Sequence, residues 1–150
     1  MKESYRQMKD RHQAEVNALP LAFAFSREQY RRKLAQWGIT EEEAEAGAVI
    51  GIGGGGFIRS SDREIVFGTL DRIQDETDAA IAADTTGEGF VYEMFFYELN
   101  NHEFRYTHSA EETLDALSIT EEELQNSEAL RHGLNKAIAA INAGPDPFGE

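Results

Sequence analysis

The sequence predicts an α+β protein with about six helices around a small, antiparallel β-sheet. Helix-start signatures recur along the chain, in which Ser or Thr is followed three residues later by Glu or Gln. Short apolar or alternating runs predict the strands, at residues 21–25, 48–52, 57–59 and 103–107. With 150 residues, 41% of them hydrophobic, the chain can build one core. We expect a single domain over residues 1–144 and a loose tail over residues 145–150.

Three helices are predicted in the first third of the chain. A mostly exposed, basic helix occupies residues 1–18. Ser26 caps a helix that ends at Trp37, where Gly38 suits the left-handed position that follows many helices. A second capping signature at Thr40 starts a short acidic helix.

The rest of the chain predicts mostly helix. A capping signature at Ser61 starts a long helix that ends near Ala83. Residues 90–100 carry apolar side chains on most sides, which is typical of a buried helix. Further helices are expected over residues 109–117, from Thr120 onward and over residues 127–142.

Charge is unevenly distributed along the chain. The net charge is −14, from 28 acidic and 14 basic residues. Residues 1–33 hold eight bases and four acids, whereas residues 34–150 hold six bases and 24 acids. Because nucleic acids are bound largely through Lys and Arg, direct nucleic-acid binding by the bulk of the domain is disfavoured. The acidic excess either keeps a solvated surface soluble or engages a basic protein partner.

Two kinds of acidic position are candidates for partner binding. Carboxylates at i, i+4 and i+7 form a row along the predicted long helix, and glutamate clusters start two shorter helices. The candidate partner-binding residues are Asp71, Asp75, Asp78, Glu41, Glu42, Glu121 and Glu122. We therefore expect a non-enzymatic binding protein whose acidic surface engages a basic protein. One version is an inhibitor or nucleic-acid mimic that acts on nucleic-acid-binding machinery.

The glycine-rich segment 51–59 supports an alternative function. Its glycines match the G-x-G-x-x-G dinucleotide fingerprint, but a predicted strand follows them where that fingerprint needs a helix. A hairpin turn or an anion-contacting loop is the remaining interpretation, with Gly53, Gly54, Gly55, Gly56 and Arg59 as candidate residues. Together with His102 and His108, this segment would form the site of a small enzyme or of a ligand- or metal-binding domain.

The basic first part of the chain supports a third function. Its bases, Arg27, Arg31, Arg32 and Lys33 among them, could contact RNA or anionic lipid. The acidic remainder of the chain opposes this reading, so it ranks below the other two.

Residue types exclude or disfavour several classes of protein. The chain has no cysteine, which excludes disulfides, thiolate zinc sites and a cysteine nucleophile. No complete metal-ligand spacing or cofactor motif is present, so we expect no metal and no cofactor. No apolar run reaches the roughly 18 residues that a membrane helix needs, so we expect a soluble, cytoplasmic protein with no membrane contact.

One motif occurs twice. Leu34-x-x-Trp37-Gly-Ile-Thr-Glu-Glu-Glu43 aligns with Leu114-x-x-Leu117-Ser-Ile-Thr-Glu-Glu-Glu123 at an offset of 80 residues. The similarity records either a duplication or local convergence, because a helix end followed by an apolar residue and a Thr cap is a common helix-to-helix turn.

Four segments carry a resemblance to known proteins. They are Phe23-Ala-Phe-Ser26, Ile52–Arg59, Ala82–Phe90 and Met94–Phe104. Their sequences resemble a family of small uncharacterised acidic proteins from gut bacteria and their mobile elements. The resemblance implies a compact bacterial protein and transfers no catalytic residue. A mobile-element origin would favour a small acidic inhibitor or decoy.

Overall fold

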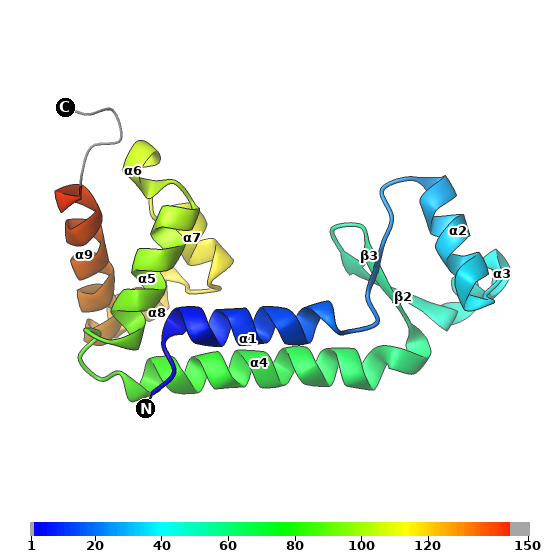
Figure 1. Ribbon diagram of the computed structural model, residues 1–150, viewed down its shortest axis with the longest axis horizontal. Coiled ribbons are helices and arrows are strands. Elements are labelled where there is room, and N and C mark those ends of the chain that lie inside the picture. Colours follow the sequence, from blue (N-terminus) through cyan, green and yellow to red (C-terminus); the bar gives the residue numbers. More distant parts are fainter. Residues whose placement is uncertain (1, 145–150) are drawn as a thin grey trace. The chain divides into compact units, whose positions relative to one another are not determined.

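Helices make up most of the chain, and the computed structural model describes residues 2–144 (Figure 1). The helices are α1 (Tyr5–Asn17), α2 (Arg27–Trp37), α3 (Glu41–Glu43), α4 (Arg63–Ala83), α5 (Phe90–Asn101), α6 (Phe104–Thr107), α7 (Glu111–Ala116), α8 (Glu121–Asn126) and α9 (Glu128–Ala143). Short helical turns η1 (Ala44–Ala48) and η2 (Ser60–Asp62) flank the strands β2 (Val49–Gly53) and β3 (Gly56–Arg59), and β1 is Ala22–Phe23. The predicted tail, residues 145–150, lies outside the described residues.

The α+β class is confirmed, with helices accompanying a small antiparallel sheet. The described chain divides into two compact units. The sheet unit is His12–Asp75, and the α5–α9 unit combines the residues up to Arg11 with those from Glu76 onward. Helices α1 and α4 each contribute a segment to both units. That residues 1–144 behave as one domain stays a prediction.

The sheet has the order β1–β3–β2, with both pairs antiparallel. Phe57 of β3 lies opposite Ala22 of β1 on one side and Gly51 of β2 on the other. A glycine turn joins β2 to β3, and the register shifts between Gly51 and Gly53. Three of the four predicted strands are therefore present, each shifted or shortened by a few residues.

The fourth predicted strand, 103–107, is wrong, because this segment forms the short helix α6. Glu103 and His108 both adopt left-handed backbone conformations, with φ of 58° and 56°, and so mark sharp turns at its two ends. Inside, the His108 amide donates to the Phe104 carbonyl at 2.7 Å. Alternation over five residues did not distinguish the two structures, because only Phe104 is buried while Tyr106 is 58% exposed.

The core of the α5–α9 unit is built where α5 packs against α9. Val91, Met94, Phe95 and Leu99 of α5 are fully buried there, as the predicted all-apolar helix requires. Gly133 of α9 permits this close approach, since a Cβ at this position would lie 2.5 Å from Val91 Cγ1.

The number of helices also differs from the prediction. The described residues form nine α-helices where about six were expected; α6 takes the place of the expected strand, and α3, α7 and α8 are short helices. The acidic helix expected from Thr40 begins with α3, Glu41–Glu43, and continues into η1, inside which Gly47, with φ of 109°, breaks the helical conformation. The N-terminal helix is less exposed than expected, since Tyr5 and His12 are both buried.

None of the helices within residues 2–144 combines the length and apolar composition that crossing a membrane requires.

Candidate functional site

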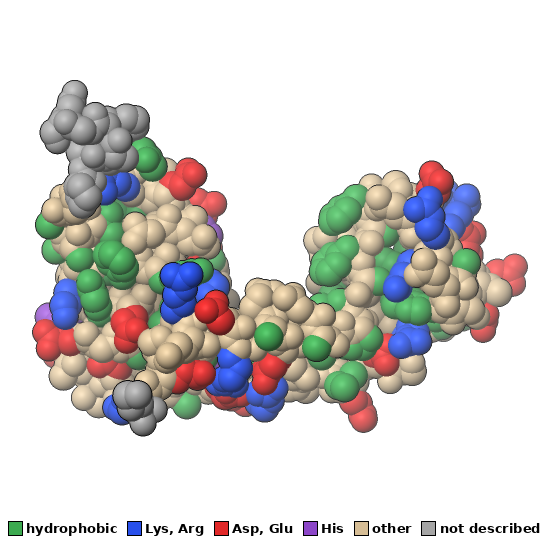
Figure 2. Space-filling model, viewed as in Figure 1, with side chains coloured by type: hydrophobic (Ala, Val, Ile, Leu, Met, Phe, Trp, Pro, Cys, Tyr) green, Lys and Arg blue, Asp and Glu red, His purple; other side chains and the backbone are tan. Residues whose placement is uncertain are grey.

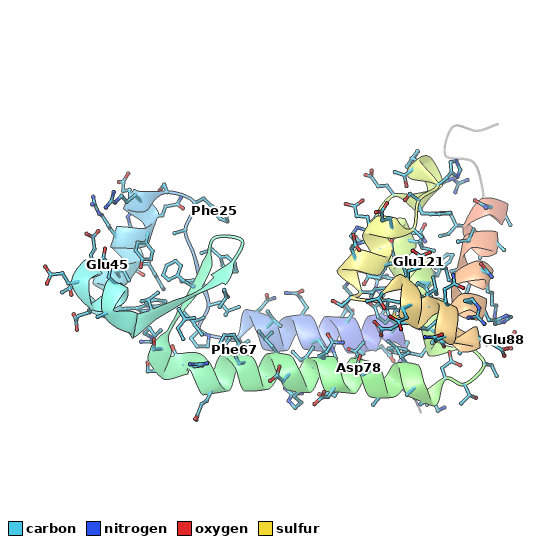
Figure 3. All side chains as sticks on the ribbon, turned by 180° about the vertical axis from the view of Figure 1, so that it is seen from behind. Phe25, Glu45, Phe67, Asp78, Glu88 and Glu121 are labelled. Atoms are coloured by element: carbon cyan, nitrogen blue, oxygen red, sulfur yellow. The ribbon has the colours of Figure 1, made fainter. Side chains whose placement is uncertain are left out.

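The strongest concentration of unpaired negative charge lies on three consecutive helices of the α5–α9 unit. We define the acidic helix segment as the exposed carboxylates of α7, α8 and the first turn of α9. They are Glu111, Glu112, Asp115, Glu121, Glu122, Glu123 and Glu128. Figure 3 shows Glu121 on α8. The segment includes two of the seven predicted partner-binding residues.

Local capping interactions place these carboxylates. Thr120 accepts a hydrogen bond from the Glu123 amide at 3.1 Å, and Glu123 accepts one from the Thr120 amide at 3.2 Å. This capping box begins α8 at Glu121 and turns its first acidic residues into solvent. Acidic side chains in a first helical turn also complement the helix dipole, which explains by local structure why they occur at this position.

Within residues 2–144, the carboxylates of the acidic helix segment are not paired with bases, although Arg131 donates to the Leu124 carbonyl of α8 at 3.2 Å. Residues 106–130 contain no Lys or Arg. Among the described residues, none of the seven carboxylates takes part in an ion pair. A local charge of this size stays exposed to solvent and to any basic surface that approaches.

The other predicted acidic residues lie elsewhere and in different surroundings. Glu41 pairs with Arg31, whereas Glu42 beside it is exposed. Asp71, Asp75 and Asp78 are exposed along α4, with Asp78 labelled in Figure 3. Glu41, Glu42, Asp71 and Asp75 belong to the sheet unit, while Asp78 belongs to the α5–α9 unit. Their role in partner binding stays a prediction.

The glycine-rich segment is the turn of the β2–β3 hairpin. Gly53, Gly54 and Gly55 all have positive φ, between 59° and 89°, which the tight turn requires and other residues rarely adopt. Arg59 does not face this turn as an unpaired charge. Its guanidinium pairs with Asp62 at 2.9 Å and stacks over the Trp37 ring at 5.3 Å. The tight hairpin turn is therefore sufficient to explain the glycines of this segment.

The histidines of the alternative site and the glycine turn belong to different units. His102 and His108 lie on either side of α6 in the α5–α9 unit, whereas the turn belongs to the sheet unit. Within the described residues, no three His, Asp or Glu side chains come close enough to hold a metal ion. His132 pairs with Glu88, which Figure 3 labels, at 3.3 Å.

The loop between α4 and α5 is organised by one carboxylate. Asp84 accepts hydrogen bonds from the amides of Gly87 at 3.0 Å, Gly89 at 3.0 Å and Val91 at 2.9 Å. Burial acts to raise the pKa of Asp84, but these hydrogen bonds lower it below its usual value. The carboxylate thus serves as the internal acceptor of the loop and the start of α5.

A buried charge cluster on α5 has no counterpart in the sequence analysis. Glu98 is 2% exposed, and its Oε2 atom accepts from the Tyr5 hydroxyl and pairs with the Lys9 ammonium. Burial, followed by the hydrogen bond to Glu98, raises the pKa of the Tyr5 hydroxyl far above its usual range. Asn101 lies at 3.5 Å from the other carboxylate oxygen. Because the carboxylate is enclosed, the cluster holds the start of α1 on α5.

Position in the sequence gives little sign of this cluster. Glu98 follows three aromatic residues in a helix that is mostly apolar, and a buried charge on such a helix needs a partner. The partners lie about ninety residues earlier in the chain, so helical spacing within α5 does not identify them.

A comparison with protein families gives one match, which covers residues 4–140. The matching model is described as a family of unknown function, DUF7659. The chain belongs to this family. Neither the curated proteins nor the solved structures yield a match. The match therefore agrees with the expected membership of an uncharacterised family. It assigns no activity to any residue.

Proposed function

We propose that this member of the family is a non-enzymatic binding protein whose acidic helix segment engages a basic surface of another protein. The observation that carries the proposal is the run of seven exposed carboxylates on α7, α8 and α9, in a stretch without Lys or Arg. Electrostatic complementarity of this kind speeds association and selects basic partners.

The contrast with other acidic residues supports the choice of this surface. Glu3 and Glu76 both pair with Arg11, at 3.0 and 2.6 Å, and Glu15 pairs with Arg72 at 3.0 Å. A basic partner would have to compete with these arginines. At the acidic helix segment, no ion pair among the described residues competes with the partner in this way.

A finer version concerns the class of partner. Rows of carboxylates can occupy a basic groove that normally holds phosphates, so the partner would belong to the nucleic-acid-binding machinery and the protein would act as its inhibitor or nucleic-acid mimic. The resemblance to proteins of gut bacteria and their mobile elements favours this version, with the encounter taking place in the cytoplasm.

The repeated motif provides a matched test. Glu121→Gln/Glu122→Gln alters the acidic helix segment, whereas Glu41→Gln/Glu42→Gln alters the same Ile-Thr-Glu-Glu-Glu sequence in the sheet unit. Each pair leaves the N3 glutamate of its capping box intact. The full chain would be immobilised, exposed to cell lysate, and washed with increasing salt.

We expect a basic protein to be retained and then released as salt shortens the Debye length from about 8 Å at physiological ionic strength to about 3 Å at 1 M. The Glu121→Gln/Glu122→Gln variant would lose two surface ion pairs with the partner, so its affinity should fall about ten-fold. The affinity of the control variant should change little. Heparin should displace the partner if its nucleic-acid-binding groove is occupied. Retention that ignores salt, or equal effects of the two variants, would refute the proposal.

A further inference from the structure

Strand β1 and the bend that follows it turn large side chains outward and small ones inward. Ala22 is 5% exposed, whereas Phe23 and Phe25 are 57% and 79% exposed. A strand that only covers a core would show the opposite pattern, because burying a phenyl ring stabilises a protein far more than burying a methyl group. Figure 2 shows hydrophobic side chains gathered at the surface of the sheet unit. Exposed rings of this kind indicate a binding surface.

The surroundings of the two rings are rich in hydrogen-bond donors. Phe23 and Phe25 border an open hollow of about 340 Å³ whose other lining residues are Gln29, Arg32, Lys33 and Gln36 of α2. No carboxylate lines this hollow. Residues 16–40 carry four bases and one acid, in contrast to the acidic remainder of the chain. The hollow therefore favours an anionic occupant.

The glycine turn supports one of the rings. A Cβ at Gly55 would lie 2.9 Å from Phe25 Cε1 and 2.9 Å from the Ala24 carbonyl oxygen. The absence of a side chain lets the turn lie directly against Phe25, and the Ala24 amide donates to the Gly55 carbonyl at 2.9 Å. The Phe25 amide donates to Gln29 at 2.8 Å, which fixes the chain on the other side of the ring. Phe25, labelled in Figure 3, is therefore held in place although it is exposed.

We propose that Phe23, Phe25, Arg32 and Lys33 form a binding site for a short single-stranded nucleic-acid segment. Phe23 lies on β1 and Phe25 in the bend that follows it, and both rings border the same hollow, so each ring can stack with a different base. Arg32 and Lys33 then contact phosphates. Lys33 lies over the Trp37 ring at 5.1 Å, which places its charge beside the sheet.

The charges already present on α2 permit this exchange. Arg32 pairs with Glu28 at 3.1 Å, but both side chains are largely exposed. An exposed pair of this kind contributes little to stability, so a phosphate can replace the carboxylate. This site is independent of the acidic helix segment, which belongs to the other unit. An acidic peptide would satisfy the charges but has no general need for two exposed rings.

Fluorescence anisotropy with a labelled oligothymidylate of about ten nucleotides tests the site in the full-length protein. We expect saturable binding at low salt, with a slope of log K against log salt near −1.4, since two phosphate contacts contribute about −0.7 each. Phe25→Ala should weaken binding by about five-fold or more, because stacking contributes about 1–3 kcal/mol per base. Arg32→Gln/Lys33→Gln should flatten the salt slope.

Phe96→Ala serves as the matched control, because Phe96 is a partly exposed aromatic residue, 38% exposed, of the α5–α9 unit. It should leave binding unchanged, and circular dichroism would confirm that every variant is folded. Undetectable binding at low salt, or equal binding by Phe25→Ala and the wild type, would overturn the proposal. So would equally tight competition by a glutamate-rich peptide, which would identify the hollow as a docking site for an acidic protein.

Discussion

The sheet unit and the α5–α9 unit hold seven basic residues each within residues 2–144, but ten and 16 acidic residues respectively. In the sheet unit, Arg31, Arg32, Arg59 and Arg72 pair with acidic neighbours. In the α5–α9 unit the excess of acids is concentrated on α7 and α8. The same supply of bases thus leaves one unit nearly balanced and the other strongly negative.

The two units also differ in what they bury. Eleven buried hydrophobic residues form a continuous core in the α5–α9 unit. The sheet unit fully buries Leu34, Ile58 and Val66, but exposes Phe23, Phe25 and Ile65. The unit with the larger core exposes charged side chains to solvent, whereas the unit with the smaller core exposes aromatic rings. We therefore propose partners of different chemistry for the two surfaces.

The largest expected effect tests how tightly the α5–α9 unit is packed. Gly133→Ala places a Cβ 2.5 Å from Val91 Cγ1 and 2.8 Å from the Gly87 carbonyl oxygen, so α5 and α9 must separate. We expect a loss of about 3 kcal/mol in the free energy of unfolding. Urea denaturation followed by circular dichroism measures it.

The control for this change is Gly68→Ala on α4 in the sheet unit, where a Cβ meets no atom within 4 Å. Better helix propensity should stabilise this variant by up to about 1 kcal/mol. Trp37, the single tryptophan, lies in the sheet unit and reports on it by fluorescence. Equal destabilisation by Gly133→Ala and Gly68→Ala would show that the two units do not differ in how tightly they are packed at these positions.

An intermediate effect is expected from Asp84→Asn. The new amide group replaces the oxygen that accepts from Gly89 and Val91, at a cost of about 2 kcal/mol near neutral pH. Since folding lowers the pKa of Asp84, its contribution is present above the usual pKa of about 4 and is lost as pH falls through the lower, folded-state value.

Unfolding measured between neutral and acidic pH should therefore show the gap between wild type and Asp84→Asn closing on acidification. In the sheet unit, Asp62→Asn removes a partly exposed ion pair with Arg59 and should cost at most about 1 kcal/mol. A gap that stays constant with pH would show that the Asp84 charge does not stabilise the loop.

The smallest expected effect concerns the tyrosines of the two units. Tyr5→Phe removes the hydroxyl that Glu98 accepts from and should cost about 1.5 kcal/mol. Because folding raises the pKa of Tyr5, its contribution is complete below about pH 10 and is lost at higher pH, where the unfolded chain releases the proton first. Tyr5→Phe should therefore resist alkaline unfolding better, relative to its stability at pH 7, than the wild type.

Tyr30 of the sheet unit is the matched control, because its ring contacts Phe57 while its hydroxyl makes no hydrogen bond within the described residues. Tyr30→Phe should change the free energy of unfolding by less than about 0.5 kcal/mol. If alkaline pH changes the free energy of unfolding of Tyr5→Phe and Tyr30→Phe in the same way, the predicted difference between the two tyrosines is wrong.

Helix starts and the charge pattern were predictable from the sequence. Ser26, Thr40 and Thr120 cap helices as predicted, because each cap joins a side chain to a backbone amide three residues away. The cap predicted at Ser61 is wrong, since Ser61 lies inside the turn η2 and α4 begins only at Arg63. The lack of bases between residues 106 and 130 is likewise a property of the sequence. These features need no information about distant parts of the chain.

Only the tertiary structure decided which side chains are buried and which charges are paired. Residues 103–107 form a helix because Phe104 enters the α5–α9 core, and Glu98 is tolerated there because Tyr5 and Lys9 reach it from α1. Phe23 and Phe25 lie outside because Ala22 takes the buried position on β1. Burial and pairing depend on neighbours brought together by folding, whereas capping and net charge depend on residues adjacent in the chain.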